Sequence, residues 1–220
     1  MIHKTLQKVV AALPFTNGTT IAGGSIASLL LKEPVNDWDV TFSSISDVDR
    51  AIAWSRADKN VNVICETPNA VTIKCAEIEQ PIQLIRVVTG EPRDMIQTFD
   101  YVHTTNFYNI KDGLVINTAA ASSLLQKKLV YVGTKYPVAA LFRLRKFLSR
   151  GWTIDVSQII KMALQVSYLD LRDPEVFAEQ VRGVDESAIS EAMIANIGNF
   201  EGMLDEISRH LDFSKNETYV

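Results

Sequence analysis

Two short motifs stand close together in the segment IAGGSIASLLLKEPVNDWDVTF, and their order constrains the fold more than any other feature. Gly23-Gly24-Ser25 follows the apolar residues 20–22, which predict a strand, and precedes an apolar run at 26–31 that is typical of a buried helix. Asp37-Trp38-Asp39 then opens a segment that alternates polar and apolar residues like a half-buried strand. The sequence therefore predicts a unit of strand, glycine turn, helix and acidic strand.

These residue types suit a site for a metal ion and a triphosphate. Side chains two positions apart on a strand point to the same face, so Asp37 and Asp39 can hold a hard divalent cation, Mg²⁺ or Mn²⁺, through oxygen ligands. Gly23 and Gly24 allow the backbone to approach a ligand closely. The free N–H groups at the start of the following helix, together with Ser25, favour phosphate.

The segment resembles the signature of the nucleotidyltransferase superfamily that includes DNA polymerase beta. It is most similar to the head domain of CCA-adding enzymes and poly(A) polymerases, and to small phage or bacterial relatives. The resemblance implies an α+β fold, in which a small mixed or antiparallel sheet carries helices, and a site with two Mg²⁺ ions. That branch usually has Arg-Asp shortly after the glycine pair, where this chain has Ala27 and Ser28.

Two residues are candidates for the place of a third carboxylate. The resemblance puts Gln83, in the strand predicted over residues 81–87, where the superfamily carries that acid. Glutamine offers a carbonyl oxygen but no charge, so it would weaken a two-metal site. Asp100, in Thr98-Phe99-Asp100, is the alternative catalytic metal ligand, and a turn or helix-cap aspartate is an equally open interpretation.

A basic helix is predicted over residues 137–150, between a proline at its first position and Gly151. It resembles the helix that follows the head domain in CCA-adding enzymes. Arg143 and Lys146 lie three residues apart on one helical face, so both can contact one triphosphate or RNA strand. A solvated basic face is the alternative. Arg86 is expected to join these two residues in offsetting the negative charge of the nucleotide.

Charge is distributed unevenly along the 220 residues, whose net charge is −4. Residues 113–154 carry 7 basic and no acidic side chains, whereas residues 155–220 carry 5 basic and 13 acidic ones. A local cationic block suits a triphosphate or an RNA end, and it can also pair with the acidic tail. We expect a catalytic head domain at residues 1–117 and a mostly helical domain at residues 118–220.

The composition is that of a folded protein, with 47% hydrophobic and 22% charged residues. No apolar stretch approaches the roughly 18 residues that indicate a membrane span, and the first residues lack a signal-peptide pattern. Cys65 and Cys75 are expected to be buried thiols in a reducing compartment, which predicts a cytoplasmic protein. His103 is expected to be a satisfied structural histidine, with contact to a substrate as the alternative, and Trp38 and Trp152 are expected to pack in the core.

Several further elements are expected. The 3-4-3-4 spacing of apolar residues from Phe200 to Leu211 predicts an amphipathic last helix. Ser46 is expected to cap a helix over residues 46–57.

The predicted activity is metal-dependent transfer of a nucleoside monophosphate from an NTP to an acceptor hydroxyl, with release of pyrophosphate. An RNA 3′ end is the expected acceptor, and a hydroxyl of a protein or small molecule is an alternative. A further alternative is a catalytically degenerate nucleotide- or RNA-binding module or inhibitory partner protein. The sequence does not indicate the oligomeric state.

Overall fold

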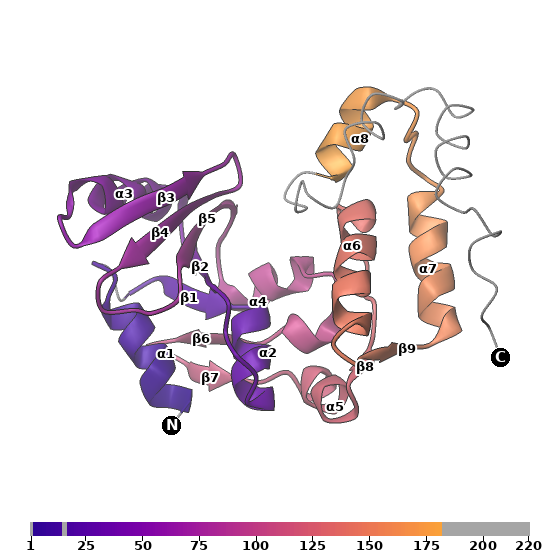
Figure 1. Ribbon diagram of the computed structural model, residues 1–220, viewed down its shortest axis with the longest axis horizontal. Helices are drawn as coiled ribbons and strands as arrows, with labels where there is room; N and C mark the ends of the chain where they lie inside the picture. The colour runs from indigo at the N-terminus through magenta and orange to yellow at the C-terminus, as the bar shows by residue number, and fades with distance from the viewer. Residues whose placement is uncertain (1, 15–16, 182–220) are drawn as a thin grey trace, which may run out of the picture.

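The computed structural model describes residues 2–14 and 17–181 (Figure 1). A seven-stranded mixed sheet forms the first part of the chain, and it confirms the predicted α+β class. Only β2 and β5 pair in parallel; the other neighbours in this sheet are antiparallel. In spatial order its strands are β3 (Val61–Glu66), β4 (Ala70–Cys75), β5 (Ile82–Thr89), β2 (Trp38–Phe42), β1 (Thr19–Ala22), β6 (Phe107–Asn109) and β7 (Gly113–Val115).

Two helices cover the sheet on the face that carries Trp38, Val40 and Phe42 of β2. They are α1 (Ile2–Ala11) and α3 (Ile45–Ala57), whose buried apolar side chains join those of the strands in one core (Figure 1). Because side chains alternate along a strand, Asp39 points to the other face of β2. The core therefore fixes the orientation of this acid by burying its neighbours.

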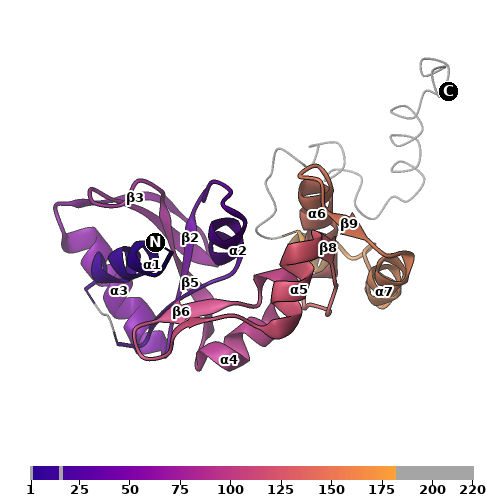
Figure 2. The ribbon, with the colours of Figure 1, turned by 90° about the horizontal axis from the view of Figure 1, so that it is seen from below.

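The second part of the chain is mostly helical and lies beside the head sheet (Figures 1 and 2). A second core is centred on Tyr101, Leu129, Tyr131 and Trp152, and Ala27 of the head belongs to it. A short parallel pair, which the sequence did not predict, joins two of its segments. The elements of this helical part are α5 (Thr118–Gln126), β8 (Lys128–Leu129), α6 (Pro137–Leu148), β9 (Thr153–Ile154), α7 (Val156–Val166) and α8 (Pro174–Gln180), and β8 and β9 form the parallel pair.

Between the head sheet and this helical part lie α2 (Gly24–Leu31), α4 (Pro92–Met95) and the two 3-10 turns η1 (Ile96–Thr98) and η2 (Val102–Thr104). The Tyr101 hydroxyl donates a hydrogen bond of 2.8 Å to the carbonyl oxygen of Ala140 on α6. The segment that precedes η2 is thereby tied to the basic helix. The domain boundary after residue 117 stays a prediction.

Three details differ from the sequence expectations. Asp37 precedes β2 instead of lying within it. Ser44, not Ser46, caps α3, because the Ser44 hydroxyl accepts a hydrogen bond from the Asp47 backbone N–H. Cys75 is buried as expected, but Cys65 is exposed on β3, the last strand at one edge of the sheet.

The predicted helix around residues 200–211 lies outside the described residues. Within the part of the chain that the structure describes, no helix combines the length and apolar character needed to cross a membrane.

Candidate active site

Asp39 lies at the centre of the sheet, where the glycine turn begins. In β-sheet register it faces Ala22 of β1 on one side and Gln83 of β5 on the other. Gly23 follows Ala22 directly, so the turn starts beside the Asp39 side chain. The pairing of β2 with β1 and with β5 therefore brings Ala22, Asp39 and Gln83 together, although they are distant in sequence.

Gly23 is required at the turn by its backbone conformation. Its φ of +83° lies in the left-handed region that residues with a Cβ rarely adopt. A Cβ built on Gly23 would make only an ordinary van der Waals contact, 3.4 Å from Oδ2 of Asp39, so the positive φ is what requires glycine. Gly24, which begins α2, faces open space. No side chain caps the N-terminus of α2, so its backbone N–H groups are available to a ligand.

Asp37 and Gln83 meet beside Asp39. The Gln83 side-chain Nε2 donates a hydrogen bond of 3.1 Å to Oδ2 of Asp37. This contact leaves the Gln83 carbonyl oxygen without a partner among the described residues. The three side chains predicted from the acidic strand and from β5 are therefore brought together, even though Asp37 precedes the strand itself.

In the part of the chain that the structure describes, Asp39 has no counterion in ion-pair contact. Desolvation by the surrounding protein, followed by the charge of Asp37, raises its pKa to about 7. The Lys146 ammonium opposes both effects but forms no ion pair with Asp39. A buried carboxylate with a second acid beside it is stabilised by a bound cation, so the donor set of Asp37, Asp39 and the Gln83 carbonyl oxygen suits Mg²⁺ or Mn²⁺.

Asp100 is placed differently from the metal ligand predicted for it. It lies in the wall of the same cleft, and its Oδ2 accepts a hydrogen bond of 2.5 Å from Nε of Arg143 in an ion pair. Among the described residues, no group of three His, Cys, Asp or Glu side chains is arranged to hold a metal ion. Asp100 and Arg143 thus neutralise one another, and Gln83 takes the third position beside the two aspartates.

Arg86 lies apart from the aspartates. Its guanidinium binds Oε1 of Glu66 at 2.6 Å and the carbonyl oxygen of Thr67 at 3.2 Å. It lines a separate surface pocket together with Arg56 of α3. The side chain leaves β5 toward α3, so the sequence expectation that it contacts the triphosphate conflicts with its position.

A cleft of about 1120 Å³ opens over Asp39, between the sheet and the helical part. This volume exceeds what a nucleoside triphosphate needs. Some of its wall was predicted, namely Gly23, Gly24, Asp39, Asp100 and Arg143.

The rest of the wall was not predicted. It includes Gln97, Thr98 and Phe99 before η2, the loop from Gly133 to Tyr136, and Gln165 of α7. The loop before α6 carried a signal in its glycine and proline, which mark a turn that leads into a helix.

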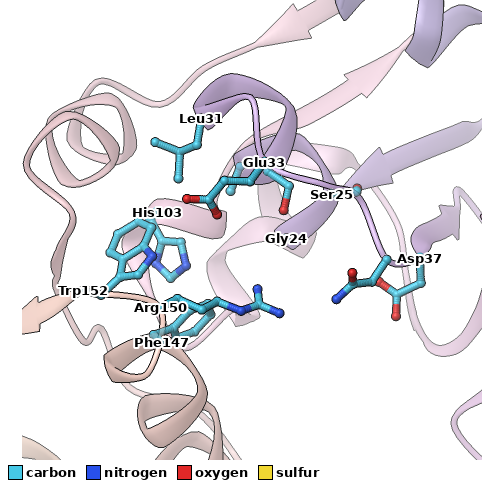
Figure 3. A pocket seen from close by; sticks show the side chains of 12 residues that line it. Gly24, Ser25, Leu31, Glu33, Asp37, His103, Phe147, Arg150 and Trp152 are labelled. Atoms are coloured by element: carbon cyan, nitrogen blue, oxygen red, sulfur yellow. The ribbon is translucent and has the colours of Figure 1, made fainter.

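A second, smaller pocket adjoins the cleft. Gly24 and Phe147 line both cavities, whereas Asp37 and Ser25 line only the smaller one (Figure 3). The Ser25 hydroxyl lies 3.5 Å from the carbonyl oxygen of Ala22, to which it donates a hydrogen bond. The two aspartates thus serve two adjoining cavities, Asp39 the large cleft and Asp37 the small pocket.

Comparison with known proteins matches residues 1–127 to the family described as Gabija anti-defense 2 family protein. A curated protein of Bacillus phage SPbetaL7, "Gabija anti-defense 2", is 24% identical over 183 residues, which make up 81% of this chain and 44% of that protein. The chain therefore spans less than half the length of this relative.

Solved structures of CCA-adding enzymes share the fold. The enzyme of Bacillus stearothermophilus in complex with CTP has a TM-score of 0.55 and 12% identity, with 88% of this chain and 52% of that chain covered. The Thermotoga maritima enzyme complexed with tRNA has a TM-score of 0.54 and 13% identity, with coverages of 94% and 50%. At such identities the likeness establishes the nucleotidyltransferase fold alone.

Proposed function

Because this chain belongs to the Gabija anti-defense 2 family and has a nucleotidyltransferase fold, we propose that it counters Gabija defence as a metal-dependent nucleotidyltransferase. It moves a nucleoside monophosphate from an NTP to an acceptor hydroxyl and releases pyrophosphate. The acceptor is an RNA 3′ end. Solved relatives are described in complex with CTP and with tRNA, which supports both substrate classes.

One observation carries this proposal: Asp39 lies at the floor of a large cleft, with Asp37 and Gln83 beside it, and no cation of the described residues is paired to it. Partly buried acids in such an arrangement are typical of sites that gather divalent metal. Bound Mg²⁺ supplies charge stabilisation to the nucleotide and its leaving group.

The other residues supply phosphate contacts around the same cleft. Gly23 and Gly24 keep the start of α2 open, so that backbone N–H groups meet the triphosphate. Lys146 adds positive charge near Asp39. The Arg143 side chain is 41% exposed despite its ion pair, so its guanidinium remains able to contact an α- or β-phosphate.

Pyrophosphate release tests the proposal directly. Purified protein is incubated with Mg²⁺, each of the four NTPs and total RNA, and the wild type is compared with Asp39→Asn. Loss of a metal ligand lowers turnover by at least about 10³-fold, because the charge that holds the ion disappears. Asp49→Asn, an exposed acid on α3, is the matched control and retains turnover. Equal rates for wild type and Asp39→Asn reject the metal-ligand role.

A catalytically degenerate binding module is the second candidate. It is favoured by the lack, among the described residues, of a third free carboxylate beside the two aspartates. Gln83 stands in register with Asp39, and Asp100 is paired with Arg143. Titration with Mg²⁺ in the presence of a fluorescent ATP analogue separates the two functions. An enzyme binds the analogue more tightly as Mg²⁺ is added and loses this dependence in Asp37→Ala. A degenerate module binds equally well without metal.

A further inference from the structure

The small pocket beside Asp37 has a polar lining that the nucleotide cleft does not use. It is bounded by Ser28 on α2, Asn36 in the loop before β2, Arg150 after α6, and the aromatic rings of Phe147 and Trp152. Its volume is about 70 Å³. In Figure 3, His103 and Trp152 stand on one side of the pocket and Asp37 on the opposite side, with Arg150 between them.

His103 is the unusual member of this lining. It is only 1% exposed, and neither Nδ1 nor Nε2 has a hydrogen-bond partner among the described residues. Its ring packs against Phe147 and Trp152 at centroid distances of 4.5 and 4.4 Å. Burial lowers the pKa of His103 to about 4, so the ring is neutral near pH 7, with one N–H donor and one nitrogen acceptor. Buried polar groups rarely remain unpaired unless a ligand or water completes them.

Three more polar side chains in the lining are uncommitted. Within residues 2–14 and 17–181, the side chains of Ser28, Asn36 and Arg150 form no hydrogen bond or ion pair. Ser28 stands where the resembling branch carries an aspartate, and Ala27 where it carries an arginine. The smaller side chains leave this face of α2 open to the pocket.

Size and charge decide which group fits. A cavity that holds one water molecule has a volume of about 10–15 Å³. The 70 Å³ of this pocket therefore holds about five non-hydrogen atoms. A complete nucleobase is larger, whereas the edge of a ribose ring with its two hydroxyls fits. Glu33 is paired with Lys127 at 2.7 Å, and Arg150 faces Asp37 without a second cation. The lining therefore has no excess of positive charge to attract phosphate, and it favours a neutral hydroxylated group.

We propose that this pocket binds the terminal ribose of the acceptor RNA through its 2′,3′-diol, and so presents the attacking hydroxyl beside Asp37. The assignment rests on the proposed function. The 3′ oxygen forms a bond to the α-phosphorus of the NTP in the large cleft. The bond from that phosphorus to the bridging oxygen of pyrophosphate breaks, and the hydroxyl proton is released to water. Neutral His103, Ser28 and Arg150 hold the diol by hydrogen bonds.

Binding without turnover tests this assignment. The protein is saturated with Mg²⁺ and α,β-methylene-ATP, which supports no transfer, and titrated with fluorescent oligoribonucleotides that end in a 2′,3′-diol or in a 2′,3′-dideoxyribose. Loss of about two hydrogen bonds weakens binding of the dideoxy oligonucleotide by about tenfold. Ser28→Phe fills the pocket and removes the preference. His103→Phe keeps the aromatic packing, removes the polar ring edge, and reduces the preference to about threefold or less.

Arg150→Ala and its neighbour Arg145→Ala provide a matched pair, since Arg145 is exposed on α6 outside the pocket lining. Only Arg150→Ala diminishes the preference for the diol. Equal affinity of the wild-type protein for the two oligonucleotides overturns the assignment, as does displacement of the RNA by a serine-containing peptide. Metal-dependent binding of α,β-methylene-ATP with no preference for the diol rejects this inference alone. Absence of that nucleotide binding rejects the proposed function as well.

Discussion

Two carboxylates line the same cleft in opposite electrostatic states. Asp39, on the sheet, is paired to no cation within residues 2–14 and 17–181, and its pKa is raised to about 7 by desolvation and by Asp37. Asp100, in the segment between η1 and η2, is only 8% exposed but forms a 2.5 Å ion pair with Arg143 of α6. Both acids are enclosed by protein, yet only one is compensated within the fold.

The difference indicates which acid the fold keeps for a ligand. A buried charge without a partner costs stability, and such a cost persists at functional sites where a ligand offsets it. The Asp100–Arg143 pair instead joins the head to the helical part and stabilises the wall of the cleft. Sharpening this contrast requires variants that alter one acid without altering the other.

The largest effect on stability is expected from Asp39→Asn in metal-free protein. The pKa of Asp39 lies above its ordinary value of 3.8, so its favourable contribution is complete below pH 3.8 and is lost as the pH rises through about 7. At pH 8 the ionised carboxylate destabilises the wild type, and the asparagine variant is more stable by roughly 2–4 kcal/mol. Urea unfolding at pH 8 and pH 5 measures the difference, which shrinks at the lower pH.

Magnesium provides the control for this result. Millimolar Mg²⁺ with ATP raises the stability of the wild type at pH 8 and leaves Asp39→Asn unchanged, because only the ionised acid binds the ion. If Asp39→Asn is less stable than wild type at pH 8, the charge of Asp39 does not destabilise the metal-free protein, and the interpretation is wrong.

Asp100→Asn is expected to act in the opposite direction. The substitution removes the charge that compensates Arg143, so the free energy of unfolding falls by about 1–3 kcal/mol. Affinity for Mg²⁺ in the presence of nucleotide stays within about twofold, since Asp100 is engaged by the arginine. Isothermal titration calorimetry measures that affinity, and a loss as large as that of Asp37→Ala restores Asp100 as a metal ligand.

The contrast between these acids also shows what the sequence can specify. Asp37, Asp39 and the glycine pair were predictable because they lie on adjacent elements whose periodicity and turn chemistry are local. Gln83 lies beside Asp39 because strand pairing sets β5 next to β2, and its role as a third ligand stays a prediction. Local pattern thus specified the sheet floor of the site.

The opposite wall depends on long-range packing, which local pattern does not encode. Whether Asp100 turns toward the metal or toward Arg143 is decided by how α6 docks, 43 residues later in the chain. His103 was expected to be structural, because a sequence cannot show that both ring nitrogens are buried without partners. Arg86 was misplaced for a related reason: its direction from β5 depends on Glu66, which the neighbouring hairpin brings to it.

Lys146→Met is expected to change the behaviour of Asp39 moderately. The Lys146 ammonium lowers the pKa of Asp39, so its removal raises that pKa further. In the metal-free protein, the titration midpoint of the Asp39 carboxyl moves upward by about 0.5 pH unit, since Lys146 is exposed and screened by solvent. Carbon-detected NMR of the side-chain carboxyl measures the midpoint. Arg145→Met, one residue away on α6, leaves it unchanged.

The smallest effect is expected from Arg86→Ala, which tests whether the charge of the cleft is local. Arg86 shares Glu66 with Arg56, and the three side chains lie on the surface between α3 and the sheet. Exposed pairs of this kind contribute little, and Arg56 still neutralises Glu66 after the substitution. Pyrophosphate release therefore stays within about twofold of wild type. Salt screens exposed charges over about 8 Å at physiological ionic strength. A tenfold loss of turnover in Arg86→Ala would therefore show that Arg86 lies within reach of the nucleotide.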